Sequence, residues 1–171
     1  MECQPNAQGV AVSRTRAREI ALHLIYEMNF RTFENDEEIL ECLDEGAMKS
    51  LAGEAKLYEK PLTEQQRSYI LGIVKGVAEK QDELDEKITS NSKGWSLKRI
   101  TRISRAILRL ALYEMVYVED VPVGAAINEA VELAKEYDSE DAGRFINGIL
   151  GTVGRSLSQE DRAQSGEQTD E

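Results

Sequence analysis

Histidine, cysteine and proline are scarce in this sequence, and their scarcity excludes several kinds of site. The 171 residues include one histidine, two cysteines and three prolines. His23 has no cysteine near it in the sequence, and no HExxH or CxxC pattern occurs, so a zinc site is not expected. Cys3 and Cys42 suggest no disulfide framework, which fits a reducing cytosol. We therefore expect neither a metal nor a cofactor.

Long apolar runs and catalytic signatures are also missing. No window approaches the roughly 18 apolar residues of a membrane span. The opening MECQPNAQGV lacks the basic and apolar regions of a secretory signal, so a cytoplasmic location is expected. No GxSxG nucleophile elbow and no phosphate-binding loop occurs, and no carboxylate lies in an obviously apolar stretch suited to acid–base catalysis. The sequence therefore predicts a binding protein, not an enzyme.

Apolar residues recur at helical spacing, and no run alternates long enough to predict a strand. The clearest region is 102–148, where breaks at EDVP and DSED separate three helical segments, the middle one over 123–137. Pro122 supports the first break because proline disfavours helix at the preceding residue. Further helices are predicted over 13–30 with Ser13 as N-cap, over 34–60, over 63–88 behind a Thr63–Gln66 capping box, and over 96–118 with a break or kink near Thr101.

These segments predict a single all-α domain over residues 13–155. Residues 1–12 lack periodicity and are predicted to form a flexible leader. Residues 156–171, SLSQEDRAQSGEQTDE, have no apolar periodicity and are predicted to form a disordered acidic tail.

Charge is distributed very unevenly along the chain. The formal net charge of −11 argues, taken alone, against a nucleic-acid partner. Residues 34–45 carry seven acidic residues and no basic one, whereas residues 93–109 carry six basic residues and no acidic one. Because salt screens a charge beyond about 10 Å, the local distribution matters more than the sum.

Two basic groups are candidates for contact with an anion. Arg14, Arg16 and Arg18 lie near the predicted start of the first helix, where positive charge opposes the helix dipole and favours an external anion. The alternative is a solvated basic first turn. The second group is a ridge on one face of the 96–118 helix, which could meet RNA, a partner protein, or the acidic residues of 34–45 or 79–86. It consists of Lys98, Arg102, Arg105 and Arg109.

Three stretches carry a resemblance to a known family. They read AILRLALYEM from Ala106, DVPVGAAINEAVELAKEY from Asp120 and SEDAGRFINGIL from Ser139. SRTRAREIALHLIYEMNF and GWSLKRI, nearer the N-terminus, reinforce them. Together they resemble the bacterial transcription antitermination factor NusB family over most of residues 13–155, most weakly across 31–62. The resemblance implies an all-α fold of about seven helices in two small bundles packed as one domain.

The resemblance also implies a function without catalysis. Proteins of this family pair with NusE, a ribosomal small-subunit protein, and bind the single-stranded boxA element of nascent ribosomal RNA transcripts. With other Nus factors the complex tethers the RNA to RNA polymerase and suppresses premature termination. Family members occur as monomers and as dimers.

Five residues match the family's RNA-binding positions. They are Arg14, Arg16, Arg18, Asp141 and Arg144. The Asp141 carboxylate would discriminate bases by accepting a hydrogen bond from an exocyclic amine, although simple capping of the last helix by this residue is an alternative. Asp138 and Ser139 are further candidates for that cap. Gly143, where the family carries a polar side chain, is a departure that could alter local contacts. For the arginines and Asp141 to share one RNA, the fold must bring both ends of the domain together.

Two other functions are compatible with these helices. One is a protein-only adaptor whose basic ridge meets an acidic partner. The other is a stand-alone relative of the helical domain that precedes the catalytic part of some RNA cytosine methyltransferases. The second is disfavoured because nothing after Gly154 could hold a methyl-donor site.

Overall fold

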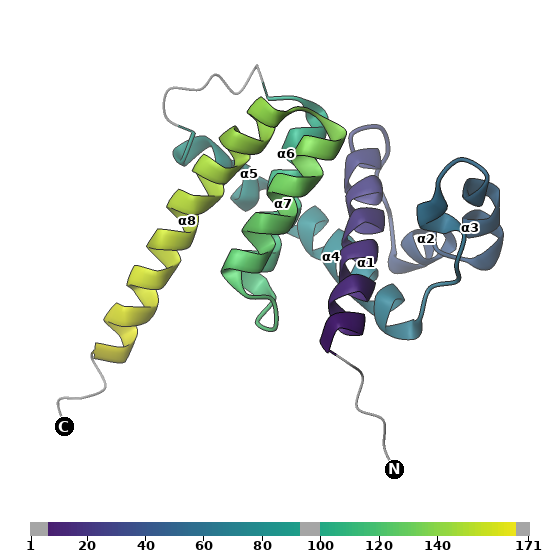
Figure 1. The fold of residues 1–171 in the computed structure, drawn as a ribbon, viewed down its shortest axis with the longest axis horizontal. Coiled ribbons are helices and arrows are strands. Elements are labelled where there is room, and N and C mark those ends of the chain that lie inside the picture. Colours follow the sequence, from purple (N-terminus) through teal and green to yellow (C-terminus); the bar gives the residue numbers. More distant parts are fainter. Residues whose placement is uncertain (1–6, 93–99, 167–171) are drawn as a thin grey trace, which may run out of the picture. The chain divides into compact units, whose positions relative to one another are not determined.

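The computed structural model describes residues 7–92 and 100–166, and these form eight α-helices and one 3-10 helix without a strand. The all-α prediction is confirmed. The chain divides into two compact units, Met1–Glu79 and Lys80–Glu171, each with its own packed helices. Figure 1 shows the course of the chain from α1 to α8.

The first unit is built on α1 (Ala7–Glu27) packed against α4 (Glu64–Glu79). The apolar side chains of α1 from Ala17 to Ile25 recur at helical spacing and are buried. The facing helix α4 buries apolar residues at the same spacing, Ile70, Ile73, Val74 and Val77. The helical spacing of these side chains therefore correctly identified the core of this unit.

Two short helices and a 3-10 turn replace the single helix predicted over 34–60. They are α2 (Asp36–Glu41), α3 (Glu45–Ala52) and η1 (Lys56–Tyr58). Asn35 caps α2 by accepting a hydrogen bond from the Glu38 amide at 3.0 Å. Asp44 caps α3 in the same way, 2.7 Å from the Ala47 amide. The second cap starts a new helix inside the predicted one, because its side chain replaces the backbone acceptor that a continuous helix would supply.

The predicted capping box at the start of α4 is present. The Gln66 amide donates to the Thr63 hydroxyl at 3.1 Å, and the Thr63 amide donates to Oε1 of Gln66 at 2.9 Å. The helix was predicted to continue to about Ile88, but it ends at Glu79 and α5 (Gln81–Ser90) begins after Lys80. Lys80 has φ −105° and ψ 12°, outside the helical range, so the break is a change of backbone conformation at one residue.

In the second unit, α6 (Arg102–Tyr117) contacts α5, α7 (Val123–Tyr137) and α8 (Glu140–Gly166). Burial of α6 extends around most of its circumference, which marks it as the central helix. Thr101 caps it by accepting from the Ser104 amide at 3.1 Å, at the predicted break. α7 has the predicted bounds and packs along α8 (Figure 1).

Gly154 allows α8 to approach its neighbours closely. A Cβ at this position would lie 3.2 Å from Cγ1 of Val123, which is tighter than ordinary contact, and 3.5 Å from Cδ1 of Ile127. The backbones of α7 and α8 can therefore pack more closely here than two side-chain-bearing residues would allow.

The helices extend beyond the predicted ends of the domain. α1 begins at Ala7, inside the predicted leader, and α8 continues to Gly166, inside the predicted tail (Figure 1). Residues 155–166 include leucine, glutamine, glutamate, arginine and alanine and no proline. Such residues propagate an existing helix without an apolar face, whereas the prediction relied on apolar periodicity.

No helix in the part of the chain that the structure describes is long and apolar enough to cross a membrane.

Candidate nucleic-acid interface

The corner between α7 and α8 is fixed by two side chains that end one helix and start the next. Asp138 accepts hydrogen bonds from the Thr101 hydroxyl at 2.6 Å and the Ser104 hydroxyl at 2.7 Å, which ties the corner to the start of α6. The Ser139 hydroxyl accepts from the Ala142 amide at 3.1 Å and caps α8. The corner therefore has a defined shape before any ligand binds.

Asp141 and Arg144 lie in the first turn of α8 and face solvent. Their side chains are 88% and 76% exposed, and Nη1 of Arg144 lies 2.8 Å from Oδ1 of Asp141. So exposed a pair contributes little to folding stability, about 0–1 kcal/mol. Ser139, and not Asp141, therefore caps α8. Both side chains are available to an external ligand.

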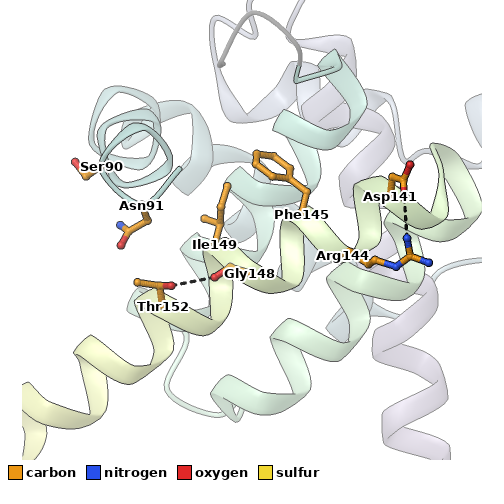
Figure 2. Close-up of a pocket in the computed structure, with 8 residues that line it drawn as sticks. All are labelled: Ser90, Asn91, Asp141, Arg144, Phe145, Gly148, Ile149 and Thr152. Atoms are coloured by element: carbon orange, nitrogen blue, oxygen red, sulfur yellow. Dashed lines mark hydrogen bonds and ion pairs between the residues drawn. The ribbon is translucent and has the colours of Figure 1, made fainter. Parts of the chain in front are cut away.

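A groove runs from this pair along α8 to the end of α5. Its volume is about 750 Å³, and it is lined by Ser90, Asn91, Asp141, Arg144, Phe145, Gly148, Ile149 and Thr152. Figure 2 shows Asp141 and Arg144 at one end, Asn91 and Thr152 toward the other, and Phe145 and Ile149 between them. Polar groups therefore flank an apolar middle section that contains one aromatic ring.

This arrangement suits an unpaired nucleotide chain. A guanidinium can hold a phosphate, a carboxylate and an amide can bond to base edges, and an aromatic ring offers a stacking face. Sequence reasoning identified Asp141 and Arg144 but missed Phe145 and Asn91. Phe145 follows the helical spacing of the core, yet it is only half-buried. Asn91 looked like an ordinary loop residue, and only the fold brings it to α8.

Lys135 of α7 lies at the same corner, where Gly143 has no side chain to exclude it. A Cβ on Gly143 would lie 3.1 Å from Cγ of Lys135 and 3.7 Å from Cε, so the stem of this lysine crosses the glycine. Nζ of Lys135 lies 3.4 Å from Oε1 of Glu132, and the lysine is exposed. The departure noted at Gly143 thus leaves room for a lysine of α7 beside the first turn of α8.

Two of the three N-terminal arginines lie differently from what the sequence predicted. α1 starts at Ala7, so Arg14 and Arg18 lie beyond its first turn, where the dipole effect has faded. The dipole argument for an external anion is therefore wrong. Arg14 is half-buried with its guanidinium carbon 5.0 Å from the centre of the Tyr69 ring, a cation–π contact. Arg18 is only 4% exposed, so a phosphate cannot reach it readily in this conformation.

Arg16 has a structural role within the first unit. Its Nε donates to the Leu57 carbonyl at 2.8 Å, its Nη1 to the Pro61 carbonyl at 3.3 Å, and its Nη2 to the Lys60 carbonyl. Three backbone acceptors, one in η1 and two in the segment that follows it, are thus satisfied by one guanidinium. Burial lowers the pKa of this arginine.

The predicted basic ridge is not a continuous surface. Arg109 is 6% exposed and bonded to Asp85 on α5, which is the intramolecular alternative considered from the sequence. Arg102 is exposed and Arg105 is half-buried. Lys98 lies outside the described residues. The cause is the central position of α6, which places neighbours on the side where the ridge was expected.

Sequence comparison decides the family. The model of the NusB family matches residues 15–155, which is most of the chain. The chain belongs to the NusB family.

Individual relatives agree with the family match. The transcription antitermination protein NusB of Acetivibrio thermocellus is 46% identical over 142 residues, covering 83% of this chain and 88% of the relative. The NusB of Ruminiclostridium cellulolyticum is 38% identical over 153 residues, covering 89% and 96%. As a NusB-family member, the chain is a non-enzymatic transcription antitermination factor. No group of three or more histidine, cysteine, aspartate or glutamate residues that could hold a metal ion occurs among the residues that the structure describes.

Solved NusB structures share the fold. The T. maritima NusB structure has a TM-score of 0.67 and 29% identity, covering 83% of this chain and 90% of that one. A structure of the antitermination factors NusB and NusE in complex with dsRNA has a TM-score of 0.65 and 24% identity, covering 84% and 97%. At that identity the likeness concerns the fold alone.

Proposed function

We propose that this NusB-family chain, together with a NusE-type ribosomal small-subunit protein, binds boxA-type single-stranded RNA in nascent ribosomal RNA transcripts. The bound complex tethers the RNA to RNA polymerase with other Nus factors. The observation that carries the proposal is the exposed Asp141–Arg144 pair, which lies at one end of a groove that Phe145 helps to line.

The geometry of the corner suggests how bases are distinguished. Arg144 can exchange Asp141 for a phosphate, because an exposed ion pair is weak and easily replaced. The freed Asp141 carboxylate then accepts a hydrogen bond from an exocyclic amine of an unpaired base. Phe145 offers a ring for stacking in the middle of the groove. Asp141 therefore governs preference between sequences, and Arg144 governs affinity for any RNA.

Electrostatics explain why a partner protein is needed. The chain carries a formal net charge of −11, and a polyanion such as RNA is repelled by that field. Arg14, Lys135 and Arg144 supply only scattered positive charge, and Arg16 and Arg18 are engaged within the fold. A basic ribosomal protein would supply the missing phosphate contacts, so the chain alone should bind RNA weakly.

An RNA titration tests the proposal. The full chain is titrated with a boxA-type RNA and with a scrambled RNA of equal composition, each with and without the NusE-type protein. We expect tight, sequence-dependent binding only when both proteins are present. Equal binding of the two RNAs by the protein pair would contradict the proposal and favour a protein-only adaptor.

A further inference from the structure

A second hollow lies in the first unit. It is formed by the C-terminal half of α1, by α3 and by the residues next to them, and has a volume of about 380 Å³. Its lining is mostly apolar: Ile20, His23, Leu24, Glu27, Cys42, Leu43, Ala47, Ser50, Leu51 and Tyr58. Leu51 in this lining is 36% exposed, so an apolar side chain at the hollow is accessible from solvent.

The hollow has an ordered floor. The Tyr58 hydroxyl and Nδ1 of His23 are hydrogen-bonded at 2.5 Å, and their ring centres are 5.8 Å apart. Tyr58 is 8% exposed, and Leu43 beside it is 1% exposed. Arg16 donates to the carbonyls of Leu57, Lys60 and Pro61, which precede and follow Tyr58 in the chain. These contacts keep the hollow open without a ligand.

The surroundings of the hollow are strongly acidic. Residues 19–59 contain eleven acidic and three basic residues, a net charge of −8. Glu27 lines the hollow itself and is partly balanced by Arg31, whose Nε lies 3.0 Å away. Burial, with Glu19 and Glu27 adding to it, raises the pKa of Tyr58 to about 12. The hollow is therefore lined by one acidic residue, Glu27, and all of its lining residues belong to a segment of net negative charge.

We propose that this hollow is a docking site for a basic, amphipathic segment of a protein partner. A bulky apolar side chain of that segment enters the hollow, and lysines or arginines beside it meet the acidic rim. A buried apolar anchor supplies affinity, and complementary charge supplies orientation and rate of encounter. Negative charge at the hollow disfavours RNA as its ligand, so this proposal does not rest on the proposed RNA groove.

The test uses a synthetic peptide of lysine and leucine in which the leucines share one helical face. Its fluorescently labelled form is titrated with the full chain, and binding is followed by anisotropy. Two matched peptides serve as controls: one replaces leucine with serine at the same charge, and the other replaces lysine with glutamate. We expect the serine peptide to bind about tenfold more weakly or worse, which is the loss of one good anchor, and the glutamate peptide not to bind.

A pair of variants locates the binding. Ser50→Trp fills the hollow and should weaken binding of the lysine–leucine peptide about tenfold. Ser68→Trp, on an exposed position of α4 outside the lining, should leave it unchanged. Should Ser50→Trp lose its helical circular dichroism, Leu51→Ser removes part of the wall at an exposed position and should weaken binding instead. Equal affinity for the leucine and serine peptides, or wild-type affinity in the variants that fold, overturns the proposal.

Discussion

Arg109 on α6 and Asp85 on α5 form a two-point ion pair. Nε of Arg109 lies 2.7 Å from Oδ1 of Asp85, and Nη2 lies 2.8 Å from Oδ2. The arginine side chain is 7% exposed and the aspartate side chain is 38% exposed. The parallel geometry matches the guanidinium fork, so the pair fixes the packing of α5 against α6.

Removing the carboxylate of this pair should destabilise the protein. Asp85→Ala leaves a mostly buried guanidinium without its acceptor, and we expect the free energy of unfolding to fall by about 1–3 kcal/mol. Urea denaturation followed by circular dichroism measures the change. Glu86→Ala, one residue further along α5 and exposed, removes the same charge and is the matched control. Similar losses in both variants would show that net charge, not the pair, is responsible.

Arg14 and Arg16 look equivalent in the sequence, but the structure separates them. Arg16→Ala leaves three backbone carbonyls without their donor, so unfolding should require about 1–3 kcal/mol less. Arg14→Ala should instead reduce the slope of log affinity against log salt for RNA by about 0.7, the value for one phosphate contact on a single strand. Denaturation and salt-dependent titrations of both variants check this. An unchanged slope in Arg14→Ala would remove that residue from the RNA site.

Substitutions of Ser139 and Asp141 should have different effects on stability, because only Ser139 caps α8. Ser139→Ala removes the acceptor for the Ala142 amide and should cost about 1 kcal/mol of stability. Asp141→Ala removes an exposed side chain and should change stability by less than about 0.5 kcal/mol. Thermal denaturation of the two variants compares them. A larger loss in Asp141→Ala would restore the capping role to Asp141.

The single histidine predicts a pH effect on stability. Burial lowers the pKa of His23, against a smaller opposing effect of Glu19. The unfolded chain, with a pKa of about 6.5, therefore binds a proton more readily than the folded chain. This contribution to stability is present above about pH 6.5 and is lost as the pH falls through the lowered pKa.

Because the chain has one histidine, its imidazole proton signal can be followed by NMR without assignment. We expect a midpoint below 6.5, and His23→Gln should lose less stability than the wild type between pH 7 and pH 5.5. A midpoint above 6.5 would contradict this account of the His23 environment.

Local signals in the sequence predicted the elements whose boundaries are chemically marked. Pro122 marked the start of α7, and the Thr63–Gln66 box marked the start of α4. The break at Lys80 was missed because the sequence around it favours helix throughout and contains no proline. A helix boundary that depends on packing, and not on local residues, cannot be predicted from the sequence around it.

Side-chain roles were harder to predict than helices. A helical wheel placed Arg109 on an exposed ridge, but it cannot show that α5 lies beside that face. The same limit applies to Arg18, which is buried in the first unit, and to Asn91, which reaches the groove only through the fold. Asp141 and Arg144 lie exposed in the first turn of α8, and their role in RNA binding stays a prediction.

The specificity ratio of the protein pair tests the central claim most directly. It is the affinity for boxA-type RNA divided by that for the scrambled RNA, measured with the NusE-type partner for the wild type and for Asp141→Asn. If Asp141 reads a base, the substitution changes this ratio by about fivefold or more, as expected for one base-edge contact, while the helical spectrum is unchanged. An unchanged ratio in the folded variant would show that Asp141 does not determine RNA preference.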